Sequence, residues 1–213
     1  MLKCDMLIDS NDIKSTLSKL KNQDNYCVLL DVTIIDYLKF PDITPSRFAV
    51  VYILRDKTFK NQISVKAFID DNTLTIDSIS DLFSSANWAE REAYDQYGIN
   101  FKGHPNLKRV LNHHQFVGHP LRKDYEITKG QICTHSEDLM DEMNPLLKQK
   151  GYTPEEINDL MLLNVGPSHP ASHGTIRNFV ALEGETITAC VTEIGYLHRE
   201  FEKSCENHTY SQI

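Results

Sequence analysis

Long apolar runs, paired cysteines, a glycine-rich phosphate loop and an excess of basic residues are all missing from this sequence of 213 residues. No stretch approaches the roughly 18 consecutive apolar residues of a membrane span. The formal net charge is −8, whereas free-standing nucleic-acid binding needs a basic surface. Three aspartates fall within the first 12 residues, unlike the start of a signal or transit peptide. We therefore expect a protein that is not exported and does not bind nucleic acid.

The five cysteines are scattered and include no Cys-x-x-Cys pair. A disulfide framework or a cysteine-held iron–sulfur cluster within this chain is therefore not expected. A glycine-rich loop that could cradle a nucleotide phosphate is also missing. The cysteines are most simply interpreted as reduced, mostly buried thiols. The sequence thus predicts a chain that binds no cofactor and no metal of its own.

Acidic residues are concentrated in the second part of the chain. Residues 1–126 carry 16 basic and 17 acidic side chains, whereas residues 127–213 carry 6 and 13. Residues 127–161 combine many carboxylates with two prolines, which is typical of a solvated connector with short helices. We expect a domain at 1–126, an acidic linker at 127–161 and a second domain at 162–213. This second domain looks incomplete, because no glycine or proline stop signal closes the chain.

The first domain is predicted to be α+β, with an antiparallel sheet and helices. Apolar residues at helical spacing predict a helix over 11–22. Three β-rich runs follow, at 27–35, 47–55 and 63–69. Asn87 and Glu90 resemble a capping box in front of a helix that reaches Tyr97, with Gly98 as its left-handed stop. The acidic residues of this helix fit internal ion pairs on a solvated or partner-facing surface better than acid–base chemistry.

The second domain is predicted to begin with strands and a helix. Strands are expected at 162–165, 175–182 and 186–191, with Glu183-Gly184-Glu185 as a tight turn between the last two. A helix is expected from about Leu197 towards the end of the chain.

A basic, histidine-rich window lies between Phe101 and Tyr125. Two Gly-His-Pro steps fix tight turns on either side of its centre, and its histidines are His104, His113, His114 and His119. One interpretation is a metal or proton-relay site. We favour a turn-rich loop that docks on an acidic partner, because the adjacent side chains of His113 and His114 rarely face one ion together. The expected docking residues are Lys108, Arg109, Arg122 and Lys123.

A second histidine loop follows the first strand of the second domain. Glycine and proline flank two imidazoles, in the order Gly166, Pro167, His169, Pro170, His173 and Gly174. Such a loop between β-rich runs presents its side chains at the tip of a hairpin. A histidine there can donate a hydrogen bond or a proton at physiological pH. The alternative is a turn with solvent-facing histidines.

Two stretches of the sequence resemble subunits of one enzyme family. The run from Asn87 to Gly98, continued through both Gly-His-Pro steps to Arg122-Lys123-Asp124-Tyr125, resembles the C subunit (30 kDa type) of proton-pumping NADH:quinone oxidoreductase, respiratory complex I. The resemblance covers about residues 26–125. It implies a cofactor-free α+β scaffold in the peripheral arm, whose basic tail lies against neighbouring subunits.

Residues 162–213 resemble the start of the D subunit (49 kDa type) of the same complex, which is related to hydrogenase large subunits. The resemblance rests on the second histidine loop and on Ile194-Gly195-Tyr196-Leu197-His198-Arg199. Together the two parts resemble the fused C/D subunit of some bacteria. Glu193, Glu200 and His208 depart from the usual family residues, where histidine, glycine and arginine or lysine are common.

The resemblance implies that His173 hydrogen-bonds a quinone headgroup and helps to supply a proton, with Gly166, Pro167, His169, Pro170 and Gly174 supporting the loop. It implies NADH, FMN and iron–sulfur clusters in partner subunits, and the B, I and membrane-arm H types as neighbours. It also implies a peripheral position on the cytoplasmic side of the bacterial inner membrane, reached through partners only. The alternatives are the large subunit of a membrane-bound nickel–iron hydrogenase and a purely structural or assembly subunit.

Overall fold

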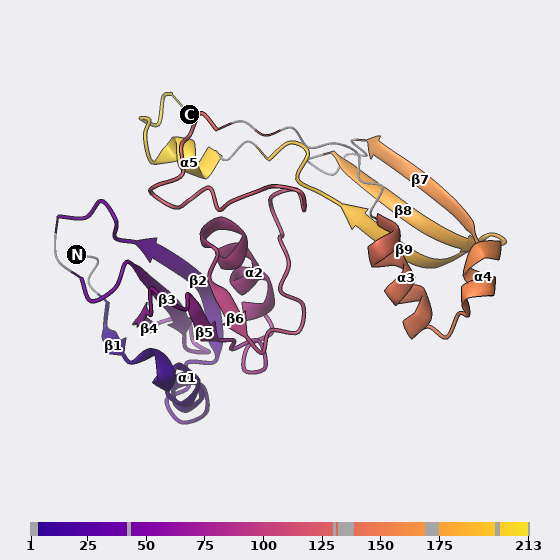
Figure 1. Ribbon diagram of the computed structural model, residues 1–213. Helices are drawn as coiled ribbons and strands as arrows, with labels where there is room; N and C mark the ends of the chain where they lie inside the picture. The colour runs from indigo at the N-terminus through magenta and orange to yellow at the C-terminus, as the bar shows by residue number, and fades with distance from the viewer. Residues whose placement is uncertain are drawn as a thin grey trace. The chain divides into compact units, whose positions relative to one another are not determined.

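The computed structural model describes residues 4–41, 44–129, 131, 139–168, 175–198 and 201–212. The chain divides into two compact units (Figure 1). The first unit consists of Met1–Val110, Gly118–Lys129 and Glu200–Ile213, and the second of Leu111–Val117 and Gly130–Arg199. Each unit is described by itself below.

A four-stranded sheet forms the centre of the first unit, in the order β1, β4, β3, β2. The strands are β1 (Met6–Ile8), β2 (Val28–Asp36), β3 (Phe48–Arg55) and β4 (Gln62–Ile69). The three long strands are antiparallel neighbours and confirm the predicted runs. The sheet is mixed rather than purely antiparallel, because β1 pairs with β4 in parallel. A separate parallel pair joins β5 (Thr75–Asp77) to β6 (Asn100–Lys102).

One face of this sheet carries the core of the first unit. Alternate residues of β3 and β4, including Tyr52, Leu54 and Val65, are fully buried, as the two-residue period of a strand requires. The short 3-10 helix η1 (Ser10–Asp12) leads into α1 (Ile13–Asn22), which confirms the predicted helix. Helix α1 adds Ile13, Leu17 and Leu20 to the same core.

Helix α2 (Ala86–Tyr97) ends as the sequence predicts, at Gly98 with φ 72°. A Cβ atom at Gly98 would lie 2.5 Å from the His119 ring, so both the backbone angle and the space favour glycine. The predicted capping box is wrong, because Glu90 is fully buried and accepts hydrogen bonds from the Ser78 hydroxyl at 2.6 Å and the Ile79 N–H at 2.7 Å. Glu90 thus ties α2 to the segment after β5, a contact that no local pattern reveals.

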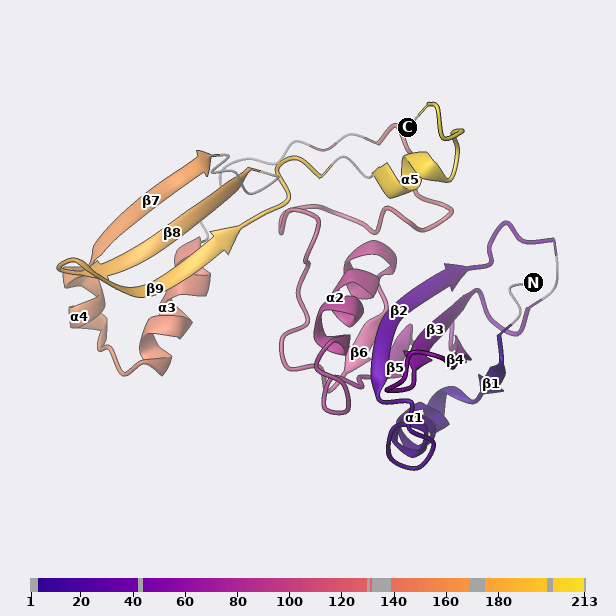
Figure 2. The same ribbon diagram turned by 180° about the vertical axis from the view of Figure 1, so that it is seen from behind.

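The second unit is a three-stranded antiparallel sheet with two helices (Figure 2). Its elements are α3 (Leu139–Gln149), α4 (Pro154–Asp159), β7 (Met161–Ser168), β8 (Ile176–Glu183) and β9 (Thr186–Glu193). The strands confirm the three predicted ones, and Gly184 adopts φ 61° in the predicted turn.

Helices α3 and α4 supply the short helices expected in the acidic segment 127–161. They also carry an apolar face that a solvated connector would lack. Leu139, Met143, Leu147 and Ile157 pack with residues of β8 and β9 in one hydrophobic cluster. Thr153 and Glu156 form a capping box at the start of α4, which fixes the entry into this helix.

Helix α5 (Phe201–Cys205) is shorter and begins later than the helix expected from Leu197, which lies in a turn. That expectation was therefore wrong about the start and length of the helix. Within the described residues, no helix is both long and apolar enough to cross a membrane.

Candidate functional site

The second histidine loop connects β7 to β8, and the ends of these two strands form its base. His169, Pro170, His173 and Gly174 lie outside the described residues. Gly166 and Pro167 lie at the end of β7, where the register shifts before Ser168 pairs with Ile176. Gly166 adopts φ 112°, and a Cβ atom there would lie 2.7 Å from the Ile176 carbonyl oxygen. Glycine is therefore required where the two sides of the loop approach each other.

Arg177 anchors the β8 side of this base. Its Nε donates to Asn164 Oδ1 on β7 at 2.8 Å, and its Nη1 donates to Glu193 Oε2 on β9 at 3.1 Å. Arg177 is only 8% exposed. One buried guanidinium thus connects all three strands of the sheet directly beside the loop, and a charge-assisted pair of this kind is geometrically specific.

Glu193 is the centre of the polar cluster at the loop base. Its Oε2 atom accepts from Arg177 and from the Tyr196 hydroxyl. Its Oε1 atom lies 2.9 Å from His113 Nε2 and 3.5 Å from His114 Nδ1. Burial, together with the hydrogen bond to Glu193, raises the pKa of Tyr196 to about 12. The cluster therefore holds a buried carboxylate between a guanidinium and two imidazoles.

The histidine segment reaches this cluster because Gly195 leaves room for it. A Cβ atom at Gly195 would lie 2.2 Å from the backbone nitrogen of His113. Any other residue would push the 111–117 segment away from β9. His113 itself is 1% exposed, and its ring lies 4.3 Å from that of His114, measured between centroids.

The histidines of the two Gly-His-Pro steps have a different role in the structure. His104 Nε2 is hydrogen-bonded to the Asn87 carbonyl at 3.1 Å, and His119 Nδ1 to the Asp95 carbonyl at 3.0 Å. Burial lowers the pKa of His119. Since a carbonyl only accepts, both rings donate to the backbone of α2. They match the interpretation of a turn-rich loop rather than that of a metal site.

The expected docking residues Arg109, Arg122 and Lys123 engage partners within the first unit. Arg109 pairs with the buried Asp95 at 2.6 Å and donates to the Gly118 carbonyl at 2.8 Å. Arg122 donates to the Tyr97 carbonyl, and Lys123 pairs with Glu206. Lys108 is exposed. Docking by these residues stays a prediction, and Lys108 offers the most accessible of the four charges.

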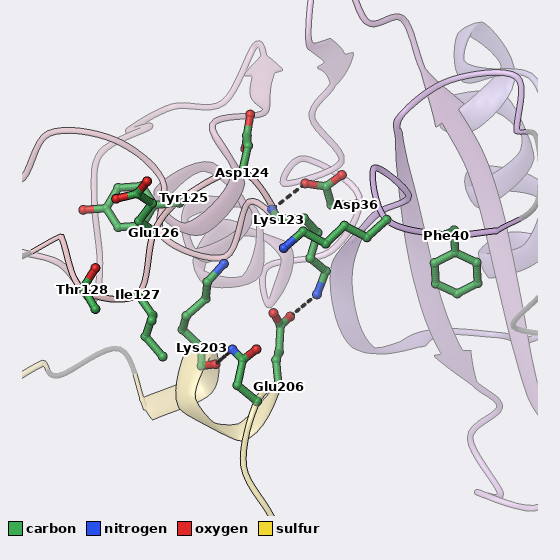
Figure 3. A pocket seen from close by; sticks show the side chains of 12 residues that line it. Asp36, Phe40, Lys123, Asp124, Tyr125, Glu126, Ile127, Thr128, Lys203 and Glu206 are labelled. Atoms are coloured by element: carbon green, nitrogen blue, oxygen red, sulfur yellow. Dashed lines mark hydrogen bonds and ion pairs between the residues drawn. The ribbon is translucent and has the colours of Figure 1, made fainter.

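Lys123 also lines an open cavity of about 650 Å³ in the first unit (Figure 3). Lys39 and Lys203 line it too, but so do four carboxylates, which belong to Asp36, Asp124, Glu126 and Glu206. Burial lowers the pKa of Lys203, whose ammonium group donates to the Arg122 carbonyl at 2.7 Å. The charges nearly cancel, so the cavity has no marked preference for anions or cations.

Sequence reasoning missed the cluster around Glu193. His113 and Glu193 are 80 residues apart, and no spacing rule pairs such positions. One signal was available, since Glu193 departs from the residue usual in the family that the sequence resembles. Arg177 also stands at the end of the loop motif, but its partner could not be inferred.

Comparison with known proteins defines the class of the chain. The family described as "Respiratory-chain NADH dehydrogenase, 30 Kd subunit" matches residues 6–131. That match covers more than half of the 213 residues, and the chain belongs to this family.

Curated relatives extend the similarity into the second unit. The chain is similar to the C/D subunit of the NADH-quinone oxidoreductase of Bdellovibrio bacteriovorus, with 42% identity over 97% of this chain and 35% of the relative. The protein of the same name from Acidiphilium cryptum is 35% identical over 95% of this chain and 37% of the relative. A solved structure described as a trypsin-resistant fragment of Nqo5 is 34% identical over 47% of this chain and 80% of that chain, with a TM-score of 0.44. The chain spans about a third of the length of its curated relatives.

Proposed function

We propose that this chain acts as a fused C/D-type subunit in the peripheral arm of an NADH:quinone oxidoreductase. In this role the first unit is a scaffold, and the second unit contributes a loop to the quinone-reduction site of an electron-transport complex that moves protons. The observation that carries the proposal is the similarity to C/D subunits over nearly the whole chain, together with a loop base in which Arg177 connects three strands.

His173 is the residue that we propose to meet the quinone. As electrons arrive, the quinone carbonyl gains negative charge, so an N–H donor stabilises the reduced states more than the oxidised one. The loop base supports this role, because Gly166 permits the close approach of the two strands and Arg177 fixes their register. Gly166, Pro167, His169, Pro170 and Gly174 are proposed to hold the loop in shape.

NADH, FMN and the iron–sulfur clusters are proposed to belong to partner subunits. The described residues favour this division, since Cys4, Cys27, Cys190 and Cys205 are free and dispersed over the fold. The proposed neighbours are subunits of the B, I and membrane-arm H types. The chain would reach the cytoplasmic side of the inner membrane through them. Stoichiometric iron, nickel or flavin in the purified chain would contradict this assignment.

The test compares two histidines of the same loop in a full-length, assembled enzyme. His173→Ala should lower quinone turnover by roughly tenfold, less than the 10²- to 10³-fold loss at a typical oxyanion site, because solvent can also protonate a reduced quinone. NADH oxidation by artificial acceptors should persist, since that chemistry takes place in other subunits. The matched control is His169→Ala, which should have a smaller effect.

Equal effects of His173→Ala and His169→Ala would contradict the assigned role. So would a parallel loss of quinone and artificial-acceptor activity in His173→Ala. Either result would make the loop structural rather than a part of the quinone site.

A further inference from the structure

We propose that His113, His114 and Glu193 bind one divalent metal ion of the zinc class. The three residues lie in the second unit, and their ligand atoms are all within 4.8 Å of one another. The inference needs only described residues and does not depend on the proposed quinone chemistry. Imidazole nitrogen and carboxylate oxygen are ligands that zinc takes readily.

The distances suit a tetrahedral ion. Zinc–nitrogen and zinc–oxygen bonds of about 2.0–2.2 Å place neighbouring ligand atoms of a tetrahedron about 3.3–3.6 Å apart. In the structure, Glu193 Oε1 lies 2.9 Å from His113 Nε2 and 3.5 Å from His114 Nδ1. The second separation matches the edge of such a tetrahedron and the first is shorter, so Glu193 and His113 must move apart slightly to admit the ion.

Neighbouring groups hold the carboxylate in the orientation that a metal needs. Arg177 and Tyr196 both donate to Oε2 of Glu193, which turns Oε1 towards the imidazoles. Hydrogen bonds of this kind around a ligand fix its direction and raise metal affinity. The Glu193 side chain is fully buried, so it loses little conformational freedom when the ion binds.

The two histidines supply a fixed and an accessible ligand. His113 is buried, whereas 32% of the His114 side chain is exposed, which gives an ion a path from solvent and leaves a position for water. His113 Nδ1 now accepts from the Gln115 N–H at 3.3 Å, so the neutral ring carries its proton on Nε2. Metal binding at Nε2 transfers this proton to Nδ1 and releases that long hydrogen bond.

The consecutive histidines lie in a backbone turn, in which the Phe116 N–H donates to the His113 carbonyl at 2.9 Å. The two rings are stacked at a tilt of 37° and both reach the same carboxylate oxygen, which adjacent residues rarely do. A bound ion would clamp the 111–117 segment to the end of β9. Because the unfolded chain lacks this geometry, binding should stabilise the folded chain.

Isothermal titration with Zn²⁺ tests the proposal, with the 213-residue chain carrying no histidine tag. We expect one ion per chain and a rise in Tm on zinc addition. Co²⁺ should give visible absorption bands of a low-symmetry, four-coordinate site. The first variant is His114→Ala, whose partly exposed side chain can be removed without emptying the core, and the second is Glu193→Gln. Each removes a direct ligand and should weaken zinc binding by more than the roughly 10- to 100-fold that is typical when only a hydrogen-bond partner of a ligand is lost.

The matched control is His208→Ala, which removes an exposed histidine on the first unit and should leave zinc binding unchanged. Circular dichroism verifies that each variant is folded. Absence of 1:1 binding by the folded chain would overturn the proposal. Equal affinity of His114→Ala and the unaltered chain would also overturn it, because the zinc would then bind elsewhere.

Discussion

The two units use buried charge in different ways. In the first unit, Asp95, Glu90 and Asp36 direct their carboxylates to backbone N–H groups and to arginines or hydroxyls of the same scaffold. In the second unit, the buried charges of the described residues gather at one place, around Glu193 at the base of the histidine loop. Buried charges are costly unless paired. The first unit uses them to fix loops to helix α2 and to the end of β2, and the second to fix the base of the loop between β7 and β8.

The units also differ in how they cover their apolar residues. The core of the first unit combines α1, α2 and one face of its sheet. In the second unit, β7 exposes Met161, Leu162, Leu163 and Val165 by 39% to 62%. Contiguous exposed apolar residues are typical of interaction surfaces. The first unit therefore buries its sheet and helices around one core, whereas the second unit leaves the apolar side chains of one strand exposed.

The largest loss of stability is expected from Asp95→Ala, which removes a buried carboxylate from the first unit. The substitution removes the carboxylate partner of Arg109 and the acceptor of the Val110 N–H. Breaking a buried ion pair from one side typically costs about 3–5 kcal/mol. Urea unfolding followed by the fluorescence of Trp88, which lies on α2 and is the single tryptophan, measures this loss in the first unit.

The matched control for Asp95→Ala is Asp81→Ala. Asp81 pairs with Lys14 at 2.9 Å, but their side chains are 60% and 43% exposed. Exposed pairs contribute at most about 1 kcal/mol. Similar losses for the two variants would contradict the claim that burial gives the Asp95 pair its importance.

A leucine pair sharpens the contrast in packing. Leu54 on β3 is fully buried, whereas Leu163 on β7 is 45% exposed. Leu54→Ala should lower the free energy of unfolding by about 2–5 kcal/mol, and Leu163→Ala by less than about 1 kcal/mol. Denaturation curves from far-UV circular dichroism compare the two variants. A large loss for Leu163→Ala would mean that β7 is covered in the isolated chain.

Helical and strand periodicity predicted the long elements of both units. The runs 27–35 and 63–69 lie within a residue of β2 and β4, because alternation and flanking turns are local signals. Strands β1, β5 and β6 have three residues each, too few for a period to show. The side-chain contacts of Glu90 and Glu193 join distant segments, so local patterns misplaced the first and missed the second.

The pH dependence of stability gives a smaller effect in the scaffold. Burial raises the pKa of Glu90 to about 7, above its ordinary value of 4.5. Between these two pKa values the folded state holds a proton that the unfolded state releases. The resulting contribution of Glu90 to the free energy of unfolding is full below pH 4.5 and is lost as the pH rises through 7. The free energy of unfolding should fall by up to about 1.4 kcal/mol per pH unit from this group.

Glu90→Gln isolates this contribution, because the amide can still accept from the Ile79 N–H without titrating. We compare the unaltered chain with Glu90→Gln in urea between about pH 5.5 and 8, the range in which the carboxyl of the folded chain titrates. The difference between them should favour the variant increasingly as the pH rises. His119, whose pKa burial lowers, acts with the opposite sign but is common to both chains and cancels. If the difference in free energy of unfolding between the two chains stayed constant with pH, the pKa of Glu90 would not be raised in the folded chain.

The central claim is that the loop between β7 and β8 meets a quinone, and photolabelling tests it most directly. A photoreactive quinone analogue is bound to the full-length, assembled enzyme, illuminated, and mapped by mass spectrometry of the digested chain. Our account predicts a label within residues 166–177 that excess quinone prevents and that His173→Ala reduces. A label that excess quinone prevents but that falls only on other segments or subunits would contradict the account.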